Sequence, residues 1–228
     1  MFPSLGSPTG ISPAFLKLFS STGAFTAVAE TAVLDAAGKE WARLPIAVSC
    51  SDNKLKLAIE LDQIKSRDLP EFMVATLKQA GMGTIISLVL PEKKATYLIY
   101  PGFKCYLNLP VTGDEAKEAP ASYRVDRNLL GEETLQGQRC KKNKVTIRSG
   151  ATEVLEATTW EAVGLKGFPL KIEMRQAENR LVMNFQKLQF ARTEGKQFEV
   201  PAGYAEYKDA QQMMFGIMKR IAGTGDSK

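Results

Sequence analysis

The chain has 228 residues, of which 44% are hydrophobic and 24% charged, an ordinary balance for a globular protein with a sizeable core. It contains no histidine, which excludes a Ser-His-Asp triad, a Cys-His pair and every histidine metal ligand. The formal net charge is +5, but the 30 basic and 25 acidic residues are well mixed, so charge does not indicate a nucleic-acid partner. No apolar run reaches the roughly eighteen residues that an integral membrane segment needs.

The N-terminal part of the chain predicts a short helix followed by three strands. Residues 1–10 are rich in Pro, Gly and Ser and are expected to be loose. Ser12 and Pro13 then provide a hydroxyl N-cap and a proline at the first helical position. Beyond this helix, apolar and polar residues alternate with the period of half-buried strands. The alternating segments are 25–34, 44–50 and 55–61.

Residues 68–80 interrupt the alternation and predict one interior helix. Asp68 and Glu71 have the spacing of a capping box, and Gly81 would end the helix. The apolar stripe of this helix is expected to pack on the concave side of the sheet. The side chains expected at that contact are Leu69, Phe72, Met73 and Leu77.

Strand patterns return after the interior helix and continue almost to the C-terminus. The next three predicted strands are 84–90, 95–100 and 103–109. Residues 112–122 are charged and rich in Ala and Pro, as in an exposed loop, and about five further strands are expected between 129 and 207. The apolar residues change parity after Phe185, which predicts a β-bulge near Gln186 and Lys187.

A C-terminal helix is predicted after these strands. Asp209 and Gln212 have the spacing of a helix cap, and Gly223 would end the helix. Its apolar stripe consists of Met213, Ile217, Met218 and Ile221. Methionines in this helix and elsewhere either form a surface that accepts varied apolar ligands or simply fill the core. These methionines are Met73, Met183, Met213, Met214 and Met218.

The sum of eight to eleven antiparallel strands and three helices predicts a mainly β fold of the α+β class. A sheet of that size must curl or split to hide its apolar face, and the helices are too few to cover a flat one. We therefore expect a curved antiparallel half-barrel with one interior helix and two terminal helices on its open side. The expected organisation is a flexible N-terminus at 1–10, a single β domain at 11–222 and a flexible tail at 223–228.

Charged clusters in the sequence indicate solvated surfaces, not catalytic sites. Glu132 and Glu133 are adjacent in a predicted strand, so they point to opposite faces and cannot flank one substrate bond. A group of basic residues near a predicted turn is not interleaved with aromatic residues that could stack on bases. We interpret this group as a solvated edge. Its members are Arg139, Lys141, Lys142 and Lys144.

Three cysteines, Cys50, Cys105 and Cys140, are too few for a disulfide scaffold and too far apart for a zinc motif. Strand parity predicts that Cys50 and Cys105 are buried with apolar neighbours, where a thiol is an inert small hydrophobe. No disulfide is the favoured prediction. The alternative, in an oxidising compartment, is one disulfide among three possible pairings, of which Cys105–Cys140 is favoured.

Several short motifs come in a recognisable order in the second half of the chain. They are Leu-Gly-Glu-Glu-Thr at 130–134, Gly-Gln-Arg-Cys at 137–140, Trp160, Gly-Phe-Pro-Leu-Lys at 167–171 and Phe-Glu-Val-Pro-Ala-Gly-Tyr at 198–204. In this order they resemble the domain of unknown function 4412 family of exported bacterial proteins. That family is similar to the periplasmic lipoprotein carrier LolA and to the envelope-stress regulator RseB. The resemblance covers roughly residues 125–207 by motif.

This resemblance implies an open LolA-like barrel whose concave face and plugging helices enclose an apolar cavity, with no catalytic residue and no cofactor. It predicts a non-enzymatic periplasmic or otherwise exported protein that holds a lipid acyl chain or another apolar ligand, as a carrier or sensor. The alternative is an envelope protein–protein interaction module, similar to RseB, with a filled cavity. The N-terminus lacks a basic start and an apolar core, so it is not expected to be a signal peptide, and the chain would then be a mature form.

The candidate ligand-binding residues are the apolar side chains of inward strand parity, together with the interior helix. No metal ligand is expected among them. They are Leu55, Leu57, Ile59, Phe72, Met73, Phe103, Leu107, Leu170, Ile172, Met174, Met183 and Phe185.

Overall fold

The computed structural model describes residues 13–68, 70–110, 123–176 and 178–223. Their strands form one sheet of thirteen strands in the order β13-β7-β6-β5-β3-β2-β1-β12-β11-β10-β9-β8, with β4 paired to β2. The strands are β1 (Phe25–Leu34), β2 (Glu40–Ser51), β3 (Lys54–Glu60), β4 (Lys65–Ser66), β5 (Thr84–Leu90), β6 (Ala95–Tyr100), β7 (Cys105–Pro110), β8 (Arg124–Leu135), β9 (Gln138–Ser149), β10 (Thr152–Ala162), β11 (Phe168–Gln176), β12 (Asn179–Gln189) and β13 (Ala205–Tyr207).

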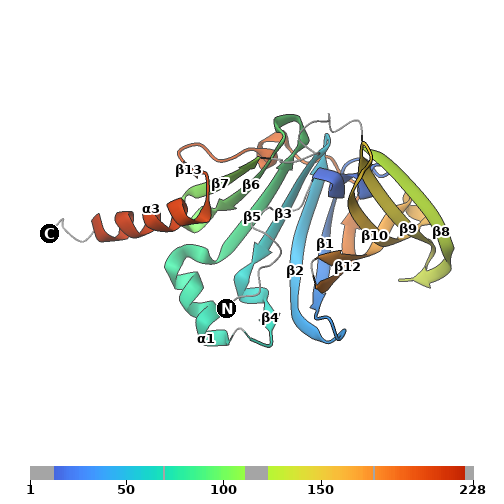
Figure 1. Cartoon of the computed structure of the whole chain (residues 1–228), viewed down its shortest axis with the longest axis horizontal. Helices are drawn as coiled ribbons and strands as arrows, with labels where there is room; N and C mark the ends of the chain where they lie inside the picture. The colour runs from blue at the N-terminus through green and yellow to red at the C-terminus, as the bar shows by residue number, and fades with distance from the viewer. Residues whose placement is uncertain (1–12, 69, 111–122, 177, 224–228) are drawn as a thin grey trace.

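Short helical segments connect or cover these strands. They are η1 (Pro13–Phe19), η2 (Leu61–Gln63), α1 (Glu71–Leu77), η3 (Lys78–Met82), η4 (Pro91–Lys93), η5 (Pro101–Phe103), η7 (Val163–Leu165), η8 (Gly195–Phe198) and α3 (Ala210–Gly223). The sheet bends into an open, curved shape whose two edges, β8 and β13, stay apart (Figure 1). The described strand pairs are antiparallel except for β13 on β7. The predicted mainly β half-barrel is therefore confirmed.

The period-two alternation places the predicted strands accurately. Three predicted segments, 25–34, 84–90 and 95–100, coincide with β1, β5 and β6. The predicted bulge is also present, because β12 slips in register against β1 between Gln189 and Gln186. Lys187 has a positive φ of 51° at this point, so the strand bends there as the sheet curls. The loop predicted at 112–122 lies outside the described residues.

The concave face carries the main core, and η1 is packed into it. Phe15 and Phe19 of η1 are buried, and the ring of Phe19 lies 5.0 to 5.9 Å from the rings of Phe25, Phe168 and Phe185. The helical segment predicted here is thus present as a 3-10 helix, whereas its predicted N-cap, Ser12, lies outside the described residues. Figure 1 shows it inside the curve of the sheet, between β1 and β10.

The interior-helix prediction is wrong in its packing. Helix α1 contacts mainly η2 and η3 at the ends of strands, and Phe72 is 70% exposed. Met73 and Leu77 are half-buried, whereas Leu69 lies outside the described residues. Pro70 occupies the N-cap without a side-chain cap bond. Asp68 does not cap because its carboxylate accepts a hydrogen bond of 2.7 Å from the indole of Trp41.

Candidate ligand-binding face

The concave face is built from rows of side chains that lie directly opposite one another on neighbouring strands. One such row crosses seven strands and is apolar apart from Ser87 and the terminal tyrosine. It runs through Ala27, Val48, Leu57, Ser87, Leu98, Leu107 and Tyr207. Since opposite residues on a sheet have Cβ atoms roughly 5 Å apart, this row is a continuous surface. The row exists because apolar residues alternate along each of these strands, so that they share one face of the sheet.

Two packed clusters occupy the two ends of this row. At one end, Val48 and Leu57 belong to the cluster that η1 covers. At the other end, Leu107 packs with Cys105 and with Met213 of α3. Between Leu57 and Leu107 the row contains Ser87, which is 9% exposed, and Leu98, which is half-buried and packs against the cluster at the α3 end.

We define the central seam as Ser87 and Leu98 of this row, together with the neighbouring pair Ile59 and Ile85 on the same face. Ile59 and Ile85 are directly opposite each other on β3 and β5, and Ser87 is directly opposite Leu98 on β6. Ile59, Ile85 and Leu98 are half-buried. The seam therefore presents three aliphatic side chains on the concave face without the complete covering that the two clusters have.

Ser87 is the polar exception in the seam. The residue is 9% exposed, and its Oγ is buried without a hydrogen-bond partner. A buried hydroxyl without a partner costs roughly 1–3 kcal/mol. Its neighbours across the strands, Leu57 and Leu98, offer no polar atom from their side chains. The seam thus combines an apolar surface with one buried hydroxyl whose hydrogen-bonding capacity is unused.

The predicted ligand-binding residues fall into three environments. Those buried in or packed against the η1-covered cluster are Leu55, Leu57, Ile59, Leu170, Ile172, Met174, Met183 and Phe185. Leu107 and Phe103 belong to the cluster at the α3 end. Met73 is half-buried and Phe72 is exposed, so the helix does not join the strand residues. Sequence reasoning missed Ile85, Ser87 and Leu98, although their inward parity was a usable signal.

A polar network links β8, β9 and β10. The carboxylate of Glu161 accepts hydrogen bonds of 3.1 Å from Arg127, Thr159 and Asn143. Thr159 is fully buried and opposes Ile172 on the next strand. Because both carboxylate oxygens have donors, this network has the character of a satisfied structural cluster.

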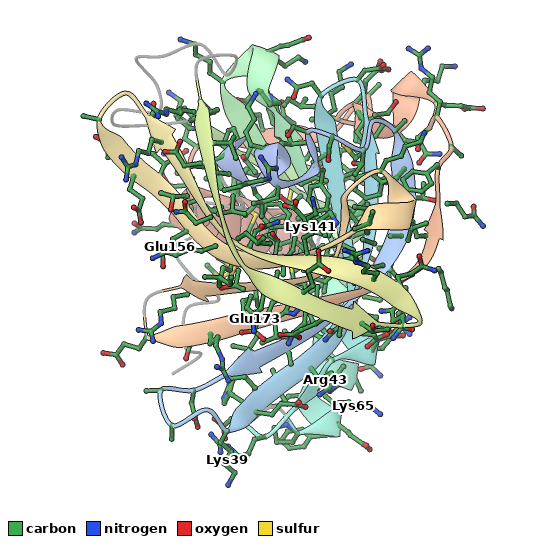
Figure 2. The ribbon with its side chains drawn as sticks, turned by 90° about the vertical axis from the view of Figure 1, so that its right-hand side faces the viewer. Lys39, Arg43, Lys65, Lys141, Glu156 and Glu173 are labelled. Carbon is green, nitrogen blue, oxygen red and sulfur yellow. The ribbon has the colours of Figure 1, made fainter. Side chains whose placement is uncertain are left out.

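The β8 edge carries compensating charges. Glu132 pairs with Arg139 at 2.8 Å and Glu133 with Lys142 at 2.9 Å, so each carboxylate has its own cation, and both are exposed to solvent, as predicted. Figure 2 shows acidic and basic side chains intermixed on this side of the molecule, with Lys141 and Glu156 labelled. The basic group at this edge is largely neutralised by neighbouring acids, which fits a solvated surface.

Trp160 is buried, at 4% exposure, and charged side chains contact its ring. Its indole Nε1 donates a 2.8 Å hydrogen bond to Glu133, and the Nζ atoms of Lys142 and Lys171 lie 4.9 and 4.2 Å from its ring centroid. The hydrogen bonds from Lys142 and then Trp160 lower the pKa of Glu133. The indole, the carboxylate and the two cations stabilise one another.

The three cysteines are buried and no disulfide joins them. Burial raises the pKa of the Cys50 thiol to about 11, and the nearby Asp52 carboxylate acts in the same direction. Burial also raises the pKa of Cys140. Both thiols are therefore kept protonated and unreactive at neutral pH.

Within its described residues, the chain has neither a metal-ion cluster nor a helix that could span a membrane. No three Cys, Asp or Glu side chains within the described ranges gather into a group that could hold a metal ion. No helix in the described part of the chain is both long and apolar enough to cross a lipid bilayer.

Residues 152–204, from β10 to beyond η8, match the family model described as Domain of unknown function (DUF4412). This match confirms the family resemblance over that segment of a mainly β chain with an open, curved sheet. A comparison with curated proteins finds no match.

Solved structures of similar arrangement include the lipoprotein LppX of Mycobacterium tuberculosis, with 13% identity, a TM-score of 0.40, and coverage of 80% of this chain and 99% of that one. A LolA superfamily protein from Nitrosomonas europaea has 11% identity and a TM-score of 0.43, and the match covers 83% of this chain and 98% of that one. A chain of the MucA/MucB complex of Pseudomonas aeruginosa has 12% identity and a TM-score of 0.38, and the match covers 83% of this chain and 61% of that one.

Proposed function

We propose that this protein is a non-enzymatic binding protein that holds an apolar ligand, such as a lipid acyl chain, on the concave face of its half-barrel. The observation that supports this most is the central seam. Its three half-buried aliphatic side chains lie beside the unpartnered hydroxyl of Ser87. Binding sites for small apolar molecules are typically apolar surfaces with a few polar groups that fix the ligand's orientation.

The seam is favoured over the η1-covered part of the face on energetic grounds. Phe15, Leu16, Leu18 and Phe19 are all buried, and burying each contributes roughly 1.5–3 kcal/mol. A ligand that displaced η1 would lose about 6–12 kcal/mol of this stabilisation. An acyl chain of about 12–16 methylenes gains only about 10–13 kcal/mol before the costs of association. A ligand bound at the seam would not incur the loss.

Ser87 is the residue that would bind a polar end of the proposed ligand. An acyl chain with a carboxyl or ester group could accept a hydrogen bond from the Ser87 hydroxyl while its methylenes contact Ile59, Ile85 and Leu98. A hydrogen bond that satisfies a buried group contributes roughly 1 kcal/mol or more. We also propose, from the family resemblance, that the protein acts in the periplasm or is otherwise exported.

The test is a titration with a fluorescent fatty acid. Wild type is expected to bind it, and Ile85→Glu is expected to weaken binding at least about tenfold, because a charge would meet the acyl chain. Val163→Glu is the matched control, since Val163 is 52% exposed on η7, outside the seam. Circular dichroism must show that both variants are folded. Absence of binding by wild type, or equal binding by Ile85→Glu, contradicts the proposal.

A second candidate is an envelope protein–protein interaction module with a filled cavity. The packing of η1 into the concave face favours this alternative, because the chain's own side chains fill part of that face. Mass spectrometry of an organic extract of the purified protein separates the two. A stoichiometric lipid supports the binding protein, whereas a clean extract combined with no fatty-acid binding supports the module.

A further inference from the structure

Helix α3 has two apolar faces, of which only one is used inside the molecule. Met213 and Ile217 are buried against β7 and β13. In contrast, Met214, Phe215 and Met218 are 52%, 68% and 58% exposed. By helical spacing the exposed three lie within a 100° arc beside the buried pair. A helix that served only to cover the sheet would need the buried face alone.

The rotation of α3 is fixed by close packing, so the exposed face is held outwards. Gly216 lies so near Tyr207 that a Cβ atom on it would be 2.2 Å from the tyrosine oxygen. At its start, Asp209 Oδ1 accepts a 2.7 Å hydrogen bond from the backbone N–H of Gln212. Figure 1 shows the helix beside β7 and β13 and extending outwards past the edge of the sheet. The exposed side chains are therefore presented away from the protein body.

The charge of this segment is positive. Residues 208–223 contain three basic residues and one acidic residue, Asp209. Asp209 already serves as the helix cap. An amphipathic helix that combines an exposed Met and Phe face with basic residues is typical of helices that lie in the interface of a lipid bilayer.

We infer that α3 docks the protein on an anionic lipid surface. Met214, Phe215 and Met218 enter the boundary between headgroups and acyl chains, and the basic residues of the segment attract anionic headgroups. A second copy of the chain fits less well, because three side chains on one short helix offer far less than the roughly 800 Å² per partner of a stable protein interface. This inference does not depend on ligand binding at the central seam.

The test measures co-sedimentation of the full chain with vesicles of phosphatidylcholine, with or without phosphatidylglycerol. Wild type is expected to bind the anionic vesicles, and less so as salt increases. The double variant Phe215→Ser, Met218→Ser is expected to lose about tenfold or more in binding, since it removes most of the exposed apolar area. Val163→Ser is the control, because it removes an apolar side chain of similar exposure from η7.

The serine substitutions replace exposed side chains, so an unchanged melting temperature and circular dichroism spectrum are expected. No vesicle binding by wild type, equal binding to neutral and anionic vesicles, or unchanged binding by the double variant overturns the inference. A dimer in light scattering that the double variant abolishes, without vesicle binding, would assign this face to a second copy instead.

Discussion

Two phenylalanines allow the packing of the concave face to be tested with the same substitution. Phe19 is 2% exposed, and its ring lies 5.0 to 5.9 Å from four other phenylalanine rings. Phe19→Ala removes that ring and leaves a cavity, so it is expected to cost about 3–5 kcal/mol of unfolding free energy. Phe72 is 70% exposed on α1, so Phe72→Ala should change the free energy of unfolding by less than about 0.5 kcal/mol.

The measurement is urea unfolding followed by circular dichroism, extrapolated linearly to water. For a domain with a total stability of about 5–15 kcal/mol, the loss in Phe19→Ala should clearly lower the urea concentration at the unfolding midpoint. The unfolding curve of Phe72→Ala should coincide with that of wild type. Equal stability of the two variants would refute the reasoning. If Phe19→Ala costs less than about 1 kcal/mol, η1 is not a packed part of the core.

The remaining predictions concern single polar groups. Ser87→Ala should leave stability unchanged or raise it by up to about 1 kcal/mol in urea unfolding, and a loss above 1 kcal/mol would mean that the hydroxyl has a partner. In a Trp41→Phe variant, the fluorescence of Trp160 should change as Glu133 is protonated. The midpoint of that change should lie below 4.5, the ordinary pKa of a glutamate. Because that pKa is lowered on folding, the carboxylate stabilises the fold above the unfolded pKa, and this contribution is lost as pH falls through the lowered value. A midpoint at or above 4.5 contradicts the indole contact. Cys50, with a pKa of about 11, should react with iodoacetamide at pH 8 on the order of 100 times more slowly than an ordinary thiol, as followed by mass spectrometry.

Local patterns predicted the strands because each strand buries one face, and burial alone imposes the period of two. The bulge at Lys187 could be found for the same reason, since a change of parity must occur where a residue is inserted. The Asp209 cap was predictable because its partner, the backbone N–H of Gln212, is only three residues away. Each of these features depends on neighbours in sequence.

Features that depend on distant residues could not be predicted. The capping box at Asp68 is chemically sound, but Trp41, 27 residues away, takes its carboxylate. The stripe containing Phe72 has helical periodicity, yet periodicity does not say whether a partner surface exists. Ser87 has inward parity in the sequence, but its lack of a hydrogen-bond partner is visible only once β3 and β6 are in place.

The position of β1 has a consequence for the order in which the chain can fold during synthesis. β1 lies between β2, which follows it directly, and β12, which comes about 150 residues later. Likewise, η1 contacts β9, β10 and β11. Neither the first strand nor the first helical segment has its full set of contacts until nearly the whole chain has emerged. A nascent chain that stops before β12 leaves β1 as an open strand edge, which is prone to pair with other chains. Completion of this half-barrel is therefore a late, long-range step, and such steps are slow.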